Sequence, residues 1–449
     1  MSRQLFGTDG IRGVAGEYPL DPPTVYCVGA ALGAWASVRG ESPQILIGAD
    51  TRESSQWIAE TMAAGLKAGG ARPRFAGLIT TPGVAWLTRT DSFQAGVMIS
   101  ASHNPYQDNG IKVFGHSGYK LPDSEEIELE REILRRAGQR PAPARTELEA
   151  EESLDLRYLD YLAGTPGADL SGLHIVIDGA NGAASHLAPR LFSRLGAKVT
   201  TTHCVPDGRN INLDCGAVHP EGLAALVREN HADFGVAFDG DADRAMFAAT
   251  SGRIVNGDAV LLINAAHMQG CGRLSGNHHG PVVVATVMSN LGLEKALEAR
   301  GIRLLRTDVG DKYVLEAMLR SEATLGGEQS GHVIFSEFAT TGDGMLTALR
   351  VAEIVRVSGK NLDELAAELK VYPQRLVNVR IRDRRPFAEV PGVLEEIRAA
   401  EASLGAEGRV LVRLSGTEPL ARVMVEGRDE AVVNAFADRI AGAIRVALG

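Results

Sequence analysis

The chain has 449 residues, of which 45% are hydrophobic and 23% charged, a composition typical of a globular protein with several domains. Its formal net charge of −10 argues against nucleic acid as the main partner, because phosphate backbones bind basic surfaces. No run of about 18 or more apolar residues occurs, so a membrane partner is not expected. The four cysteines form no CxxC pair, and the first residues lack the apolar core of a signal peptide. We therefore expect a cytoplasmic protein.

Three stretches of the chain repeat one pattern: an apolar strand, a polar loop with glycine, and a helical segment. The first has ILIGADTR from Ile45 and GVMISASHNP from Gly96, the second HIVIDGANGA from His174 and FGVAFDGDADR from Phe234, and the third VVVATVMSN from Val282 and TLGGEQSGH from Thr324. Apolar strands that alternate with helices, such as the helical pattern over residues 54–69, indicate layers of parallel strands and helices. The sequence therefore predicts three α/β units in tandem.

The last part of the chain follows a different pattern. The alternation in LVNVRIRD predicts an exposed antiparallel strand, RVLVRL and ARVMVEG predict a strand pair, and residues 393–404 and 430–448 predict helices. The expected fold class is therefore α/β, with three tandem mixed α/β domains and a smaller C-terminal α+β domain around a central cleft. The predicted boundaries are residues 1–150, 151–255, 256–370 and 371–449.

The first loop with candidate chemistry follows the strand that is predicted to end at Ser100. Ser102 lies in this loop, and a hydroxyl there can hold a phosphoryl group if a cation and hydrogen-bond donors neutralise the charge. The alternative is a polar turn at the Asn-Pro pair. His103 is adjacent, but neighbouring side chains rarely face each other, so we expect it to position the loop. Lys112 lies on the next predicted strand and points either to the same centre or into solvent.

The second loop is the sharpest candidate for a metal site. FDGDADR places Asp239, Asp241 and Asp243 at alternate positions, and three carboxylates suit Mg²⁺ rather than Zn²⁺. The alternative is a solvated acidic turn, but three carboxylates beside an apolar strand repel one another without a cation. Arg244 either pairs with these aspartates or reaches a phosphate.

Two further loops offer binding groups. GGEQSGH contains Glu328 and Ser330, which suit sugar hydroxyls or an amino group, although a glycine-rich turn is the alternative. RLSGTEP begins with Arg413, and Arg422 lies on the next strand. Hydroxyls, backbone N–H groups and two arginines predict an anion site. Near the N-terminus, Arg12 lies between glycines and either approaches a phosphate or is a surface arginine. Lys312 in VGDKY is a further candidate for the centre near Ser102.

The combination of FGTDGIRG, SASHNPYQDNGIK, DGDADR, GGEQSGH and RLSGTEPLARVMVEG resembles the α-D-phosphohexomutases. The motifs occur in the order of that family, from Phe6 to near the C-terminus. GGEQSGH points to the branch that acts on glucosamine phosphates. One segment departs from the family pattern, because GADTR has Ala49 where many relatives carry a basic residue.

The resemblance implies that Ser102 is a phosphoserine and that its phosphate, Asp239, Asp241 and Asp243 bind one Mg²⁺. It places Arg12, Lys112 and His332 beside the phosphoserine, where they would assist proton transfer or stabilise charge. The implied substrate-binding residues are Arg244, Glu328, Ser330, Arg413, Ser415, Gly416, Thr417 and Arg422.

The implied reaction converts glucosamine 6-phosphate to glucosamine 1-phosphate through a hexose 1,6-bisphosphate, and supplies precursors of amino-sugar nucleotides and the cell wall. Three alternatives remain: a mutase for uncharged glucose or mannose phosphates, a phosphatase with Asp239 as nucleophile, and a non-catalytic phosphosugar-binding protein. The expected partner is a small phosphosugar. A homodimer is compatible with the sequence, which does not fix the oligomeric state.

Overall fold

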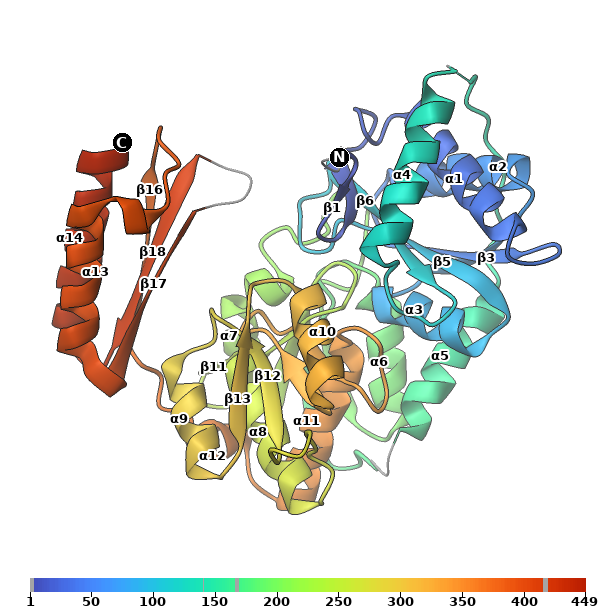
Figure 1. Ribbon diagram of the computed structural model, residues 1–449. Helices are drawn as coiled ribbons and strands as arrows, with labels where there is room; N and C mark the ends of the chain where they lie inside the picture. The colour runs from blue at the N-terminus through green and yellow to red at the C-terminus, as the bar shows by residue number, and fades with distance from the viewer. Residues whose placement is uncertain (1–3, 140, 166–168, 415–418) are drawn as a thin grey trace. The chain divides into compact units, whose positions relative to one another are not determined.

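The computed structural model describes residues 4–139, 141–165, 169–414 and 419–449 (Figure 1). The chain divides into two compact units, residues 1–287 with 304–367, and residues 288–303 with 368–449. Within the described residues, the first unit contains three β-sheets and the second contains one. No helix in this part of the chain is long and apolar enough to cross a membrane.

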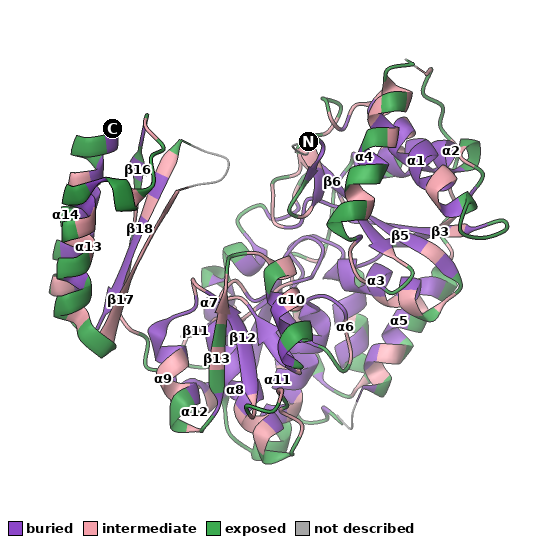
Figure 2. Cartoon of the chain, viewed as in Figure 1, coloured by how far each residue is buried: buried purple, intermediate pink, exposed green. Residues whose placement is uncertain are grey.

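The N-terminal sheet has six strands in the order β1-β2-β6-β5-β3-β4. Its elements are β1 (Phe6–Gly7), β2 (Gly10–Val14), α1 (Pro22–Ser37), β3 (Gln44–Ala49), α2 (Ser55–Ala68), β4 (Arg72–Leu78), α3 (Thr81–Thr90), β5 (Phe93–Ile99), β6 (Asp108–Gly115) and α4 (Asp123–Ala137). β3 is parallel to β4 and β5, whereas β6 is antiparallel to β5 and β2. The central strands are buried because they are almost wholly apolar (Figure 2). Helices α1 and α2 pack so closely that a Cβ at Gly29 would lie 2.3 Å from the carbonyl oxygen of Met62.

The second sheet has the order β11-β10-β9-β7-β8. Its elements are α5 (Glu152–Gly164), β7 (His174–Asp178), α6 (Ala184–Arg194), β8 (Lys198–Thr202), the 3₁₀ helix η1 (Gly216–Val218), α7 (Glu221–Glu229), β9 (Phe234–Phe238), β10 (Ala245–Ala249) and β11 (Ile254–Val255). β7 is parallel to β8 and β9, and β10 is antiparallel to β9. The loops that follow β7 and β9 therefore lie at one edge of the sheet, the usual place for ligands in α/β folds.

The third sheet has the order β13-β12-β14-β15. Its elements are α8 (Gly257–Gly270), β12 (Val282–Thr286), β13 (Arg303–Thr307), α10 (Asp311–Ser321), β14 (Leu325–Gly327), β15 (Val333–Phe335), α11 (Gly344–Ser358) and α12 (Leu362–Ala366). β14 is parallel to β12 and antiparallel to β15. All described residues of β12, β14 and β15 are buried (Figure 2).

The second unit is built on an antiparallel sheet in the order β16-β18-β17. Its elements are α9 (Leu291–Ala299), β16 (Gln374–Arg380), η2 (Phe387–Glu389), α13 (Pro391–Leu404), η3 (Gly405–Glu407), β17 (Gly408–Leu414), β18 (Leu420–Gly427) and α14 (Glu430–Leu448). Helices α13 and α14 cover one face of this sheet (Figure 1), where Val423 and Ile440 belong to one apolar core. The sheets thus agree with the expected three α/β units and one α+β unit, while the four domain boundaries stay predictions.

One part of the predicted pattern is wrong. The repeat predicts a helix after the polar loops, and a strand was expected only after the Ser102 loop, where β6 does follow β5. The loops after β9 and β14 also lead into antiparallel strands, β10 and β15. A short loop can return the chain only as an antiparallel neighbour, since parallel pairing needs a long crossover. The returning strands matter for the site, because β6 carries Lys112 and Arg244 directly precedes β10.

Candidate active site

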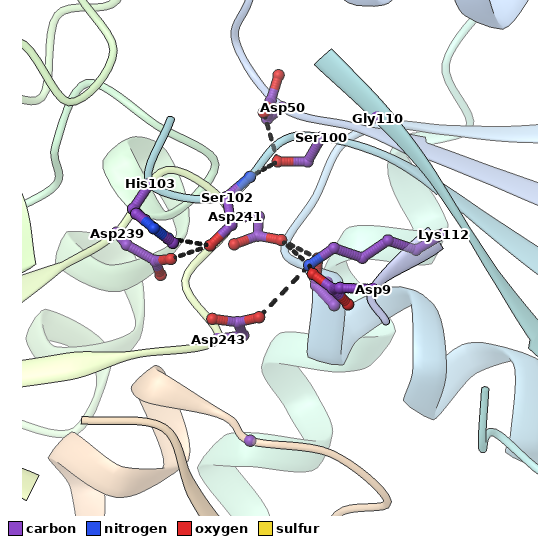
Figure 3. Close-up of polar contacts among 12 residues, drawn as sticks. Asp9, Asp50, Ser100, Ser102, His103, Gly110, Lys112, Asp239, Asp241 and Asp243 are labelled. Atoms are coloured by element: carbon purple, nitrogen blue, oxygen red, sulfur yellow. Dashed lines mark hydrogen bonds and ion pairs between the residues drawn. The ribbon is translucent and has the colours of Figure 1, made fainter. Parts of the chain in front are cut away.

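The polar loops after β5 and β9 meet within the first unit (Figure 3). The hydroxyl of Ser102 donates a hydrogen bond of 2.5 Å to Oδ2 of Asp239. Ser102 is 2% exposed, and its backbone φ of 53° lies in the left-handed region. The structure therefore brings together two groups that the sequence predicted separately.

His103 also contacts this hydroxyl, so the expectation that the two adjacent side chains do not face each other is wrong. Its Nδ1 lies 3.3 Å from Oγ of Ser102 (Figure 3). Successive side chains alternate in an extended strand, but the left-handed backbone of Ser102 breaks that alternation. Burial, together with the charges of Arg244 and Arg12, lowers the pKa of His103 to about 4, so its imidazole is neutral at neutral pH.

Asp239, Asp241 and Asp243, here called the aspartate triplet, are all buried and offer oxygens within 4.8 Å of one another. Burial, and then repulsion from the other two carboxylates, raises the pKa of Asp239 well above its usual range. Oδ1 of Asp241 and Oδ1 of Asp243 are buried and accept no hydrogen bond from any described residue. The triplet fits a divalent metal ion, because carboxylate oxygens bind hard cations and a cation would remove the repulsion.

A second group, Asp178, His203 and Cys215, also places its polar atoms within 4.8 Å of one another. Asp178 already accepts the N–H groups of Ala180 at 2.9 Å and Gly216 at 3.0 Å, and Nδ1 of His203 lies 3.1 Å from its Oδ2. Burial, followed by the charge of Asp178, raises the pKa of the Cys215 thiol to about 12. Hydrogen bonds explain this cluster, so the aspartate triplet is the better candidate for a metal site.

Lys112 supplies a buried positive charge behind the triplet. Its side chain is 1% exposed, and Nζ lies 2.8 Å from Asp241, 3.5 Å from Asp243 and 3.3 Å from Asp9 (Figure 3). Burial opposes the charge, but these carboxylates outweigh burial and raise the pKa of the ammonium group. Lys112 therefore stays protonated at neutral pH and cannot accept a proton from a substrate.

The sequence interpretation missed an ion-pair chain at the same place. Nζ of Lys120 donates to Asp9 and, at 2.6 Å, to Oδ2 of Asp311, while Asp9 also accepts a hydrogen bond from Arg12. Asp9 lies in GTDGIRG, a motif we used only for its arginine. Asp311 lies in VGDKY, which we used only for Lys312, and Lys120 lies in none of the motifs. Only the fold brings the two side chains together.

His332 is 3% exposed and faces the triplet. Its Nε2 accepts the N–H of Gly342 at 3.0 Å, and its Nδ1 lies 3.6 Å from Oδ1 of Asp243. Burial opposes protonation, but Asp243 outweighs it and raises the pKa of the imidazole. The hydrogen bond from Gly342 instead favours the neutral imidazole, since its N–H can donate only to an unprotonated Nε2. His332 is therefore placed to act on Asp243 electrostatically, although the two atoms lie just beyond hydrogen-bond distance.

A cavity of about 380 Å³ lies beside Ser102, which suits a small ligand. Oε1 of Glu328 accepts the N–H of Gly310 at 3.1 Å, and Oγ of Ser330 lies 3.5 Å from Oε2 of Glu328. The cavity therefore has cationic groups for a phosphate and a carboxylate for hydroxyl or ammonium groups. Its lining includes Arg12, Ser102, His103, Asp243, Arg244, Asp311, Glu328 and His332.

The remaining predicted site residues lie elsewhere. Lys312 does not point to the serine, because its Nζ pairs with Asp123. Arg413 and Arg422 belong to the second unit and stand directly opposite each other in the β17–β18 pair. Ser415, Gly416 and Thr417 lie outside the described residues.

A buried serine hydroxyl beside three carboxylates, with arginines and a lysine around a cavity, is the arrangement of a phosphoryl-transfer enzyme on an α/β scaffold. Four consecutive segments match the phosphoglucomutase/phosphomannomutase family: alpha/beta/alpha domain I over residues 3–140, domain II over 157–252, domain III over 256–372, and the C-terminal domain over 376–443. The chain therefore belongs to this family, which confirms the resemblance and the expected fold class.

Similar proteins extend over the whole chain. It is 60% identical to a phosphoglucosamine mutase of Solibacter usitatus, covering 100% of both chains, and 53% identical to one of Koribacter versatilis, covering 100% of this chain and 98% of the relative. A phosphoglucomutase/phosphomannomutase family protein of Burkholderia thailandensis shares the fold with a TM-score of 0.81 at 24% identity, over 99% of this chain and 97% of that one. The N-acetylphosphoglucosamine mutase of Aspergillus fumigatus does so with a TM-score of 0.66 at 19% identity, over 100% and 96%.

Proposed function

We propose that the protein interconverts glucosamine 6-phosphate and glucosamine 1-phosphate, with Ser102 as the phosphoryl carrier and Mg²⁺ as the metal. The observation that carries this proposal is the 2.5 Å hydrogen bond from Ser102 to Asp239, inside a buried triplet of carboxylates. The relatives at 60% and 53% identity, both phosphoglucosamine mutases, support the sugar. The Aspergillus fumigatus structure, in complex with GlcNAc-6P and magnesium, supports the metal.

The proposed chemistry moves one phosphoryl group in two transfers. Phosphorylated Ser102 gives its phosphoryl group to O1 of the 6-phosphate. The bond from phosphorus to Oγ breaks while a bond to O1 forms, and Oγ gains a proton as O1 loses one. The 1,6-bisphosphate then turns round, and Oγ of Ser102 takes the phosphoryl group from O6, so the bond from phosphorus to O6 breaks and O6 gains a proton as Oγ loses one. A relative from Aspergillus fumigatus was solved in complex with glucose 1,6-bisphosphate, which supports this intermediate.

The residues of the first unit have distinct roles in this proposal. A divalent cation on the triplet would supply charge neutralisation for the transferring phosphoryl group. Lys112 adds a fixed positive charge because its carboxylate neighbours keep it protonated. Arg12 and Arg244 line the cavity and offer planar donors to phosphate oxygens.

The other groups would bind the substrate. Glu328 and Ser330 would bind the sugar. The phosphate that does not react would be held by Arg413, Arg422 and the loop that joins their strands. His332 would act on Asp243 electrostatically. The cytoplasmic location, the homodimer, and the expectation that neither nucleic acid nor a membrane is a partner stay predictions.

The decisive experiment compares turnover of glucosamine, glucose and mannose 6-phosphates after priming with glucose 1,6-bisphosphate. We expect glucosamine 6-phosphate to be the best substrate, whereas higher kcat/KM on glucose or mannose phosphate would favour the phosphoglucomutase or phosphomannomutase alternative. Steady phosphate release that survives Ser102→Ala but not Asp239→Ala would instead identify a phosphatase.

A further inference from the structure

The backbone of Ser102 is held in an unfavourable conformation. Its φ of 53° lies in the left-handed region, which a residue other than glycine adopts at an energetic cost and keeps only where its surroundings stabilise it. The loop must therefore be fixed by contacts outside itself. Two side chains, from loops that follow strands of two different sheets, make those contacts on the same pair of carbonyl oxygens.

The first is Arg52, whose side chain is wholly buried. Its Nη2 donates to the carbonyl oxygens of Ser102 at 3.1 Å and Asn104 at 2.6 Å. Its Nη1 pairs with Asp50, whose Oδ2 accepts the hydroxyl of Ser100 at 2.6 Å. Oγ of Ser100 in turn accepts the N–H of Ser102 at 2.9 Å (Figure 3). One buried ion pair thus binds the N–H and the C=O of the serine.

The second is Asn212, which comes from the loop between β8 and α7. Its Nδ2 donates to the same carbonyl oxygens, Ser102 at 2.9 Å and Asn104 at 3.0 Å. Two carbonyl acceptors fix the amide with its NH₂ group toward the loop. The backbone of Asn212 is anchored in turn, because its N–H donates to the carbonyl oxygen of Ala180 at 2.9 Å.

The same contact links the serine loop to the triplet. A Cβ at Gly240, between Asp239 and Asp241, would lie 2.5 Å from the carbonyl oxygen of Ser102 and 2.9 Å from Nδ2 of Asn212. The lack of a side chain at Gly240 therefore lets the two loops approach. Any shift of the Ser102 carbonyl would also move its hydroxyl relative to Asp239.

We propose that Arg52 and Asn212 are positioning residues that form a two-sided clamp on the carbonyl oxygens of Ser102 and Asn104. The clamp stabilises the left-handed conformation of the serine and holds its hydroxyl at the triplet, where a displacement of about 1 Å costs about 100-fold in rate. This inference rests on the proposed role of Ser102 as phosphoryl carrier. Neither residue lines the cavity, so substrate affinity does not depend on the clamp.

The sharpest test is Asn212→Asp, which keeps the shape of the side chain but replaces its donor with an acceptor. Asn210→Asp is the matched control, because Asn210 lies two residues away and its side chain contacts the backbone of its own loop. Its Oδ1 accepts the N–H of Asp207, and its Nδ2 donates to the carbonyl oxygen of Val205. We would measure phosphorylation of Ser102 by glucose 1,6-bisphosphate with intact-mass spectrometry over time, and the Kd of glucosamine 6-phosphate by calorimetry. The clamp predicts phosphorylation at least about tenfold slower in Asn212→Asp, with a Kd within about twofold of wild type.

Arg52→Lys provides a second variant in case Asn212→Asp does not fold. It keeps the charge beside Asp50 but loses the planar fork, and Arg350→Lys is its control, since Arg350 is a buried arginine that pairs with Glu353. Equal phosphorylation rates in the folded variant and its control would overturn the clamp, as would a loss of rate matched by an equal loss of affinity. A wild-type protein that takes up no phosphate would instead refute the role of Ser102 itself.

Discussion

Oγ of Ser102 and Oδ2 of Asp239 are joined by a 2.5 Å hydrogen bond although 137 positions separate them in the chain. Ser102 lies in the loop after β5 and Asp239 directly follows β9, so the bond joins loops of the first and second sheets. It places a hydroxyl against a carboxylate whose charge is opposed by burial and by two other carboxylates. A divalent cation bound to those oxygens would remove this repulsion.

The first prediction concerns metal binding. Asp239→Asn keeps the side-chain shape and removes one of three mutually repelling charges, so the metal-free variant should be at least as stable as wild type. Saturating MgCl₂ should raise the melting temperature of wild type, with about 2.7 kcal/mol of stabilisation at one hundred times Kd, and should barely affect the variant. Cys215→Ser, in the cluster around Asp178, should respond to MgCl₂ like wild type. A normal Mg²⁺ response in Asp239→Asn would contradict the assignment.

The second prediction concerns the buried charge of Lys112. Lys112→Met leaves Asp241 without its cation, and removing one partner of a buried ion pair typically costs about 3–5 kcal/mol. Lys312→Met removes a lysine whose partner, Asp123, is exposed, so its cost should lie near 0–1 kcal/mol. Urea denaturation of both variants checks the difference, and equal losses would show that Lys112 is not the buried counter-charge.

The third prediction concerns pH and Asp343. Burial raises the pKa of this carboxyl to about 6, although it accepts the N–H of Leu346 at 2.9 Å and the hydroxyl of Tyr158 at 2.7 Å. The folded protein therefore binds a proton at Asp343 more tightly than the unfolded chain does. The free energy of unfolding consequently falls as the pH rises through about 6. The loss approaches about 3 kcal/mol at pH 8.

Asp343→Asn removes this titration and keeps a good helix N-cap. The melting temperature of the variant, relative to that of wild type, should rise between pH 5 and pH 8, as measured by calorimetry in matched buffers. A difference between variant and wild type that does not change with pH would show that Asp343 is already ionised at low pH.

The fourth prediction concerns sugar preference. Glu328→Gln removes the negative charge that would attract the ammonium group of glucosamine, so KM for glucosamine 6-phosphate should rise about tenfold. The same variant assayed on glucose 6-phosphate is its own control, because that sugar has no cation and its KM should change less than about threefold. Equal increases for both sugars would mean that Glu328 binds a hydroxyl.

Much of this molecule follows from short, contiguous signals. The aspartate triplet and Ser102 were predicted because each lies in one loop at the end of an apolar strand, where α/β folds gather polar groups. Helices such as α14, residues Glu430–Leu448, follow from periodicity alone. The contact between Ser102 and His103 was not predicted, because the left-handed backbone that creates it leaves no mark in the residue types.

The ion-pair chain and the clamp show what local signals miss. Lys120 contacts Asp311 across 191 positions, and Asn212 contacts Ser102 across 110. Neither pair shares a motif, and a lysine or an asparagine in a loop is usually solvated. The strand direction after each polar loop was also not predicted, because an apolar strand has the same sequence pattern whether it runs parallel or antiparallel.

The most direct test is intact-mass analysis of wild type and Ser102→Ala after incubation with glucose 1,6-bisphosphate, paired with turnover of glucosamine 6-phosphate. We expect wild type to carry the mass of one phosphoryl group and to turn over. Ser102→Ala should carry none and be inactive while remaining folded. An alanine variant that still isomerises the sugar phosphate at the wild-type rate would contradict the account.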